Sequence, residues 1–251
     1  MISVTVRVNL QPAYILHARP YRDTSSILEA MTPEHGRISL VARGARRTTR
    51  GGSNAALLQV FTPLLLSFSG RGELRTLCGT EAAGPAKSLR GEKLFSALYV
   101  NELLVRLLHR HDPHPLLFAA YGNTLDELVD AAQVEAALRR FELTLLDELG
   151  YSFDLCIDGH SGAAVHPENW YHLHSEYGLI ARGDELDARR PAFIGADLLA
   201  MDAGQWGQGS VLQTAKRLLR LALAAHLGDA PLKSRDLFRT RPGRHRGRVG
   251  G

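Results

Sequence analysis

The sequence predicts an α+β protein, in which an N-terminal β-barrel precedes a mainly α-helical domain with an irregular insertion. Residues 1–80 contain short apolar or alternating segments separated by turn residues. After residues 81–88 the apolar residues recur with the helical period instead. With 251 residues, 45% of them hydrophobic, the chain is long enough to bury a core in one large or two smaller domains.

The N-terminal strands are short, closely spaced and not separated by helices. Proline, aspartate and glycine mark turns at residues 20–23 and 32–36. This pattern fits a small barrel or a sandwich, and a five-stranded OB-type barrel has the expected size. From the residues alone both architectures stay open. Strands are expected at residues 14–18, 27–31, 38–42, 55–60, 64–68 and 73–78.

A basic loop follows the third expected strand. It places Arg43, Arg46, Arg47 and Arg50 within eight residues, in a stretch too rich in glycine and threonine for a stable helix. On an OB-type scaffold, a basic groove combined with aromatic stacking holds single strands of nucleic acid. The alternative is a solvated charge run without a partner. The predicted DNA-binding residues are these four arginines, Arg19, Arg22 and the stacking candidates Tyr14 and Tyr21.

The charges are distributed unevenly, although the formal net charge is only +4. Residues 1–80 carry ten arginines against four acidic residues, and residues 214–251 carry ten basic against two acidic residues. The stretch between them is therefore net acidic. Two basic segments that flank an acidic middle point to a polyanionic partner.

Domain boundaries follow from the changes in composition. The predicted barrel domain covers residues 1–80 and the helical domain covers residues 81–238. Residues 151–206 are rich in glycine, histidine and aspartate, and we expect an irregular insertion with short strands at residues 170–173 and 178–181. Residues 239–251 hold five arginines and four glycines and are predicted to form a disordered basic tail.

Four helices are expected in the helical domain, over residues 94–107, 124–131, 134–149 and 210–227. The second is placed by Thr124 and Glu127, which have the spacing of a capping box. Ser210 is the expected cap of the fourth helix. Gly150 and Gly228 are expected to end the third and the fourth.

Paired basic residues lie beside the apolar faces of two of these helices: Arg139 and Arg140 on the third, and Lys216 and Arg217 on the fourth. One interpretation is that they are solvated edges of buried helices. The other is a pocket for an acidic peptide with a hydrophobic end, in which a basic side chain pairs with a carboxylate. These four residues form the candidate peptide site.

Catalytic and cofactor motifs are missing or incomplete in the sequence. It contains no P-loop motif, and residues 207–212 lack the third glycine of a dinucleotide fingerprint. Residues 159–163 approach the nucleophile elbow of serine hydrolases around Ser161, but the residues that follow cannot begin the required helix. We therefore predict no catalytic residue and no cofactor, and keep a Ser161 hydrolase only as an alternative.

Eleven histidines and two cysteines raise the question of a metal site. His172 and His174 would place both rings on one face of a strand, but the spacing specifies no third ligand. Solvent-facing loop histidines are the simpler interpretation, and no metal is predicted. Cys78 and Cys156 are too few for a disulfide framework, as is usual for a reduced cytosolic protein.

Several blocks of the sequence together resemble the bacterial RecO family of DNA repair proteins: residues 13–50, 55–68, 99–104 (YVNELL), 138–142 (LRRFE) and 231–235 (PLKSR). The resemblance implies an OB-fold N-terminal domain and a non-catalytic role in recombinational repair. That role includes binding of single- and double-stranded DNA, annealing of complementary strands, and loading of RecA with RecR onto DNA coated by single-stranded DNA-binding protein. It also implies that the helical domain binds the acidic C-terminal tail of single-stranded DNA-binding protein.

The sequence departs from the family at one point. Some RecO proteins hold zinc with two C-x-x-C pairs in the insertion, whereas here Cys156 matches the first cysteine, Gly159 takes the place of the second, and no later pair exists. This difference argues against structural zinc.

Localisation is expected to be cytoplasmic and nucleoid-associated. Neither secretion nor a membrane span is expected, because the N-terminus lacks a signal pattern and charged residues interrupt the most apolar stretch, residues 211–227. The main alternative function is a peptide-binding adaptor whose basic segments do not bind DNA.

Overall fold

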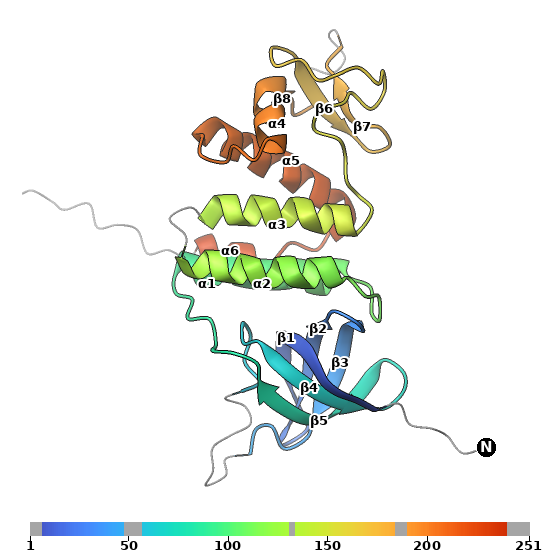
Figure 1. Ribbon diagram of the computed structural model, residues 1–251, viewed down its shortest axis with the longest axis vertical. Coiled ribbons are helices and arrows are strands. Elements are labelled where there is room, and N and C mark those ends of the chain that lie inside the picture. The colour runs from blue at the N-terminus through green and yellow to red at the C-terminus, as the bar shows by residue number, and fades with distance from the viewer. Residues whose placement is uncertain (1–6, 48–56, 131–133, 184–189, 240–251) are drawn as a thin grey trace, which may run out of the picture.

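The computed structural model describes residues 7–47, 57–130, 134–183 and 190–239. A β-barrel lies at one end of the molecule, layers of helices cover it, and a small sheet lies at the other end (Figure 1). Within the described ranges, no helix is long and apolar enough to cross a membrane.

Five strands close the barrel in the order β1-β2-β3-β5-β4. Strands β3 and β5 run parallel, and the other neighbouring pairs are antiparallel. This is the five-stranded barrel of an OB-fold, so the predicted fold is confirmed. The strands are β1 Arg7–Tyr21, β2 Ser25–Thr32, β3 Gly36–Ala42, β4 Leu64–Ser69 and β5 Leu74–Ala82.

Strand β1 is long because it pairs with two neighbours. Its first half pairs with β4 and its second half with β2. The register shifts between Val8 and Gln11 and again between Ile15 and His17, and Leu10 has a positive φ of 51°. Such irregularities bend a strand, which lets β1 turn a corner of the barrel.

The strand predicted at residues 55–60 is wrong over its described part. Residues 57–60 form an irregular loop with turns, and Phe61 has a positive φ of 64°. Leu58 packs into the barrel core, while Phe61 packs into the cluster of the helical part. The apolar spacing therefore comes from loop side chains that bury themselves on two sides, not from strand alternation.

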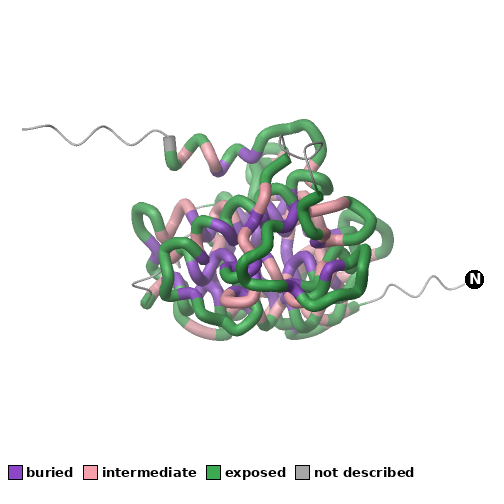
Figure 2. The backbone as a smooth tube through the Cα atoms, turned by 90° about the horizontal axis from the view of Figure 1, so that it is seen from above, coloured by how far each residue is buried: buried purple, intermediate pink, exposed green. Residues whose placement is uncertain are grey.

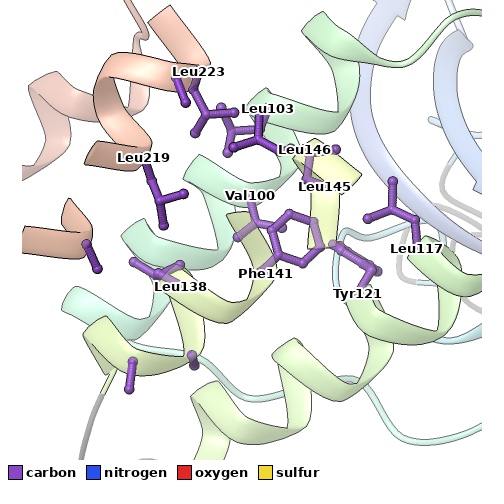
Figure 3. Packing of buried hydrophobic residues seen from close by; sticks show 14 of the residues in the cluster. Val100, Leu103, Leu117, Tyr121, Leu138, Phe141, Leu145, Leu146, Leu219 and Leu223 are labelled. Carbon is purple, nitrogen blue, oxygen red and sulfur yellow. The ribbon is translucent and has the colours of Figure 1, made fainter. Parts of the chain in front are cut away.

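The described residues form six helices after the barrel: α1 Glu92–Leu107, α2 Pro115–Asp130, α3 Val134–Glu148, α4 Gly195–Asp202, α5 Gly209–Leu227 and α6 Ser234–Arg239. Large apolar side chains from α1, α2, α3 and α5 converge on one another (Figure 3). Phe141 lies in the middle of this group, with Tyr121 and Val100 beside it (Figure 3). The hydrophobic face of each helix is thus buried against the others.

Two predicted helix starts are wrong. Helix α2 begins at Pro115, a residue whose fixed φ and missing N–H suit the first helical position. Thr124 lies inside this helix, where its hydroxyl donates to the Ala120 carbonyl at 2.8 Å. Helix α5 begins at Gly209 with Gln208 as the N-cap, so Ser210 lies in the first turn. The ends predicted at Gly150 and Gly228 agree with the structure, and both residues have positive φ.

The insertion is more regular than predicted. Strands β6 Trp170–His174, β7 Gly178–Ala181 and β8 Phe193–Ile194 form a three-stranded sheet in the order β7-β6-β8. The two strands expected there are confirmed. Helix α4 follows β8 directly and packs against α5, which attaches the sheet to the helices.

The barrel and the helices share one hydrophobic cluster. Tyr14, Leu16 and Met31 of the barrel belong to the same buried cluster as Tyr121 of α2. Buried segments gather in the middle of the molecule when it is viewed along the stack, with exposed backbone around them (Figure 2). A division into separate domains at residues 80 and 81 stays a prediction.

The β2–β3 turn also joins the barrel to the helical part. Gly36 has a positive φ of 60°, and a Cβ atom there would lie 2.0 Å from the Asp112 carbonyl oxygen. Only glycine fits this close approach. The His111 amide donates to the Arg37 carbonyl at 3.0 Å, so the loop between α1 and α2 covers this end of the barrel.

Candidate nucleic-acid interface and helical pocket

A hollow of about 620 Å³ lies at the opposite end of the barrel, where β1 turns into β2 and β3 ends. We call it the basic hollow, because arginines from both segments line it. Its lining residues are Tyr21, Arg22, Thr24, Ser25, Val41, Arg43, Gly44, Arg47 and Thr76.

Local structure explains why these arginines meet. The β2–β3 register pairs Ser26 with Ala42, which brings the loop after β3 beside the β1–β2 turn. The Arg46 amide then donates to the Thr24 carbonyl at 3.0 Å. Ala45 is buried in the barrel core and anchors the loop from below. The backbone is thus held while the long side chains point outward.

The arginine side chains in and beside the basic hollow are available for a ligand. Arg43, Arg46 and Arg47 are exposed. The Arg22 guanidinium carbon lies 5.2 Å from the centroid of the Tyr21 ring, which is a cation–π contact. Within the described part of the chain, none of these four arginines forms an ion pair with a carboxylate. Such groups can contact phosphates without first breaking a salt bridge.

Only some of the predicted DNA-binding residues line the basic hollow. Arg19 is exposed on β1 but is not one of the residues that line the hollow. Arg46 belongs to the same loop and lies beside the hollow without lining it. Arg50 lies outside the described residues. Tyr21 lines the hollow and is half-buried, so it stays a candidate for base stacking.

The prediction of Tyr14 as a base-stacking residue is wrong. Its ring centroid lies 4.9 Å from that of Tyr121 and 5.4 Å from that of Phe118, both on α2. The residue is only 9% exposed, so its ring cannot stack on a base in this structure. Its face of β1 is covered by the helices, and its aromatic ring belongs to the core.

The second cavity, which we call the helical pocket, lies among α1, α3, α5 and α6 and has a volume of about 300 Å³. Arg139 and Lys216, two of the four predicted peptide-binding residues, line it. Val134, Leu138 and Phe238 give it an apolar wall. Its other lining residues are Glu92, Ser96, Tyr99, Glu135, Glu142, Arg220 and Arg235.

A buried ion pair forms the floor of the helical pocket. Arg139 Nη2 lies 2.8 Å from Glu142 Oε1, and the Tyr99 hydroxyl donates to the same oxygen at 2.7 Å. Burial raises the pKa of the Glu142 carboxyl, against the opposing effects of the Arg139 charge and the Tyr99 hydrogen bond. Burial and the neighbouring Glu142 charge raise the pKa of Tyr99 well above its usual value, so its hydroxyl remains a donor.

The other two predicted peptide-binding residues lie elsewhere. Arg140 is exposed and pairs with Glu127 of α2. The Arg217 guanidinium carbon lies 5.6 Å from the ring centroid of Phe193 in β8, so Arg217 faces the insertion. The structure therefore brings Arg139 and Lys216 together and excludes Arg140 and Arg217 from the pocket.

Two basic residues of the helical pocket were not predicted from the sequence. Arg220 follows Lys216 by one helical turn, so its spacing is a signal that could have found it. Arg235 lies on α6, far from Arg139 in the sequence, and no local pattern connects the two.

Neither a nucleophile elbow nor a metal cluster is found in the described part of the chain. Ser161 lies in a turn, and its amide donates to Asp158 Oδ1 at 2.8 Å. Asp158 Oδ2 accepts from the Ala181 amide at 2.6 Å, so this carboxylate attaches the turn to β7. Among the described residues, no three histidine, cysteine, aspartate or glutamate side chains converge as metal ligands.

Two histidines considered as ligands have structural contacts instead. His172 is buried, contrary to the expected solvent-facing position, and its Nδ1 lies 2.9 Å from the Pro191 carbonyl oxygen. His174 Nδ1 accepts from the Glu176 amide at 3.2 Å and so stabilises the turn between β6 and β7.

Comparison with known proteins identifies the family. Residues 7–86 match the family model described as Recombination protein O N terminal, and residues 89–236 match Recombination protein O C terminal. The DNA repair protein RecO of Methylococcus capsulatus is 46% identical over 93% of this chain and 94% of its own length. The DNA repair proteins RecO of Nitrosococcus oceani (47% identical, 93% and 94% covered) and Coxiella burnetii (44% identical, 94% and 100% covered) are also similar. Two matching domain models and relatives of this similarity show that the chain belongs to the RecO family of DNA repair proteins.

Proposed function

We propose that this RecO-family chain binds single- and double-stranded DNA through the basic hollow and anneals complementary strands without catalysing a reaction. The observation that supports the proposal best is the hollow itself, where Arg22, Arg43 and Arg47 share one concave surface with Tyr21. The arginines neutralise phosphates while Tyr21 stacks on a base. OB-folds hold single strands in this way without reading their sequence.

Annealing follows from charge neutralisation. Two complementary strands repel each other through their phosphates, and a protein that neutralises both backbones lowers this barrier. Residues 1–80 supply one excess of basic residues, and residues 214–251 supply a second. DNA binding of this kind also associates the protein with the nucleoid.

The helical pocket is the proposed site for the acidic C-terminal tail of single-stranded DNA-binding protein. Arg139, Lys216, Arg220 and Arg235 provide positive charge, and the apolar wall accepts a hydrophobic end residue. A volume of about 300 Å³ is at the lower limit of ligand pockets, so it suits one anchoring residue and its carboxylate. With RecR as a further partner, the protein would help load RecA onto the coated DNA.

The test is the annealing of complementary oligonucleotides, measured at several salt concentrations, with and without the cognate single-stranded DNA-binding protein. We expect annealing that weakens as salt rises and that persists on coated strands. A protein that binds the tail peptide but neither binds nor anneals DNA would instead be a peptide adaptor with solubilising basic segments. In that case the DNA part of the proposal is wrong and the pocket part stands.

A further inference from the structure

The floor of the helical pocket contains an ion pair that an acidic ligand must disturb. Arg139 is 7% exposed and Glu142 is 1% exposed, so both members are almost completely buried. Both also line the cavity, so they are charged groups at the boundary of the space that a ligand would occupy. The pair lies within one helix, at positions three residues apart on α3.

Three buried polar atoms at this floor have no hydrogen-bond partner among the described residues: Arg139 Nε, Glu142 Oε2 and Ser96 Oγ. Ser96 is 1% exposed and also lines the cavity. Buried polar groups are nearly always hydrogen-bonded, so three exceptions beside one cavity point to a polar ligand. The guanidinium donates through Nε and the serine through its hydroxyl, and both donors suit a carboxylate.

We propose that the carboxylate of a bound acidic peptide replaces Glu142 as the partner of Arg139, and that Glu142 takes up one proton when this happens. The inference rests on the proposed function, because it takes an acidic peptide as the ligand of the helical pocket. The proton comes from solvent and binds to a carboxylate oxygen of Glu142. Glu142 thus occupies the ligand's place in the free protein and gives it up on binding.

The electrostatics of the site favour this exchange. A second carboxylate beside Arg139 would leave two buried negative charges with one buried cation, and like charges in one site disfavour joint ionisation. Protonation of Glu142 removes one of them. The protonated carboxyl also gains a donor, while Tyr99 remains protonated beside it. The charged and titratable groups around Glu142 are Arg139 on α3, Tyr99 and Glu92 on α1, Glu135 on α3, Lys216 and Arg220 on α5, and Arg235 on α6.

The affinity for the acidic peptide should fall as pH rises. Burial already raises the pKa of Glu142 in the free protein, and the ligand raises it further by withdrawing Arg139 and adding a negative charge. A group whose pKa rises on binding makes the affinity fall as pH rises between its free and bound values. Because one proton is exchanged, the steepest change in Kd is about tenfold per pH unit. None of the described lining residues is a histidine, so no imidazole titration is expected to obscure it.

The test uses the full chain and a fluorescent peptide of several aspartates that ends in phenylalanine with a free carboxylate. Calorimetry in two buffers with different ionisation enthalpies counts the protons taken up. Affinity is measured from mildly acidic to mildly alkaline pH. We expect close to one proton taken up by the wild type near the middle of the transition and weaker binding as pH rises.

Two variants test the role of Glu142 directly. Glu142→Gln should keep tight binding at alkaline pH, lose the pH dependence and take up no proton. Tyr99→Phe removes a hydrogen bond to the charged carboxylate, so it should move the pH dependence to higher pH. If the Gln variant does not fold, calorimetry of the wild type and of Tyr99→Phe still decides the question.

Failure of this inference can be separated from failure of the proposed pocket. Lys216 and Arg220 are exposed, so changing both to Ala tests whether the peptide binds in the helical pocket and leaves the buried Arg139–Glu142 pair in place. Unchanged peptide affinity in that variant would place the peptide elsewhere and overturn both ideas. Reduced affinity combined with no proton uptake, or with the same pH profile in Glu142→Gln, would keep the pocket and overturn the exchange.

Discussion

The basic hollow and the helical pocket use arginine in opposite ways. Arg43, Arg46 and Arg47 in the hollow's loop are exposed and have no carboxylate partner among the described residues. Arg139 in the pocket is almost fully buried and already holds Glu142 at 2.8 Å. The first arrangement suits a long polyanion that meets many screened charges. The second suits one short ligand that must match a fixed position.

Exposed and buried arginines contribute differently to the free energy of binding. Exposed cations gain little from any single contact, and their combined effect depends strongly on salt. A buried cation is costly to leave without a partner, so its site discriminates between ligands by geometry and protonation. The two sites can therefore be separated by experiments on stability, on salt dependence and on ligand choice.

The largest expected effect is on stability. Arg139→Ala leaves Glu142 buried without its cation, and breaking such a pair costs about 3–5 kcal/mol. Arg140→Ala is the matched control, because it removes an exposed pair with Glu127 that contributes about 0–1 kcal/mol. Chemical denaturation of both variants measures the difference. The deficit of Arg139→Ala should shrink as pH falls, since a protonated Glu142 needs no cation; equal stability of both variants would refute the buried-pair argument.

The next effect is on DNA. Changing Arg43, Arg46 and Arg47 to Ala should make the log–log salt slope for single-stranded DNA shallower by roughly two units, because each phosphate contact contributes about 0.7. Fluorescence anisotropy at several salt concentrations measures it. A variant in which the exposed Arg90, Arg140 and Arg182 are changed loses the same charge away from the hollow. If both triple variants change the slope equally, the loop contributes only net charge.

The barrel and the main helices could be predicted because their signals are local. Alternation identified β3 and β4, and helical spacing identified α1 and α3. The local sequence could not show which of Arg139 and Arg140 lines the helical pocket, because both residues flank the same apolar stripe of α3. The answer depends on α6, a distant part of the chain that supplies another wall of the pocket. The prediction that Tyr14 stacks on bases was wrong for the same reason, because α2 covers a strand face that would be exposed on the barrel alone.

A smaller effect is expected from the aromatic part of the hollow. Tyr21→Ala should weaken binding of single strands by about 1–3 kcal/mol, the usual contribution of one stacked base. It should change the salt slope little, because the ring carries no charge. Tyr14→Phe is the control, since Tyr14 lies in the core and its ring is retained. Equal DNA affinity of Tyr21→Ala and the wild type would remove stacking from the proposed site.

The smallest effect concerns the two neighbouring cations of α5. Lys216→Ala should weaken binding of the acidic peptide by about 1 kcal/mol, roughly fivefold in Kd, because its exposed ammonium is screened by solvent. Its present partner Glu135, 2.7 Å away, further limits the gain from a ligand contact. Arg217→Ala should leave peptide affinity unchanged, since its guanidinium lies over Phe193 and outside the pocket. Both variants lose one charge from adjacent positions on one helix, so a general electrostatic attraction predicts equal losses. Peptide titrations that show a loss for Lys216 alone would establish that position, not net charge, determines the contact.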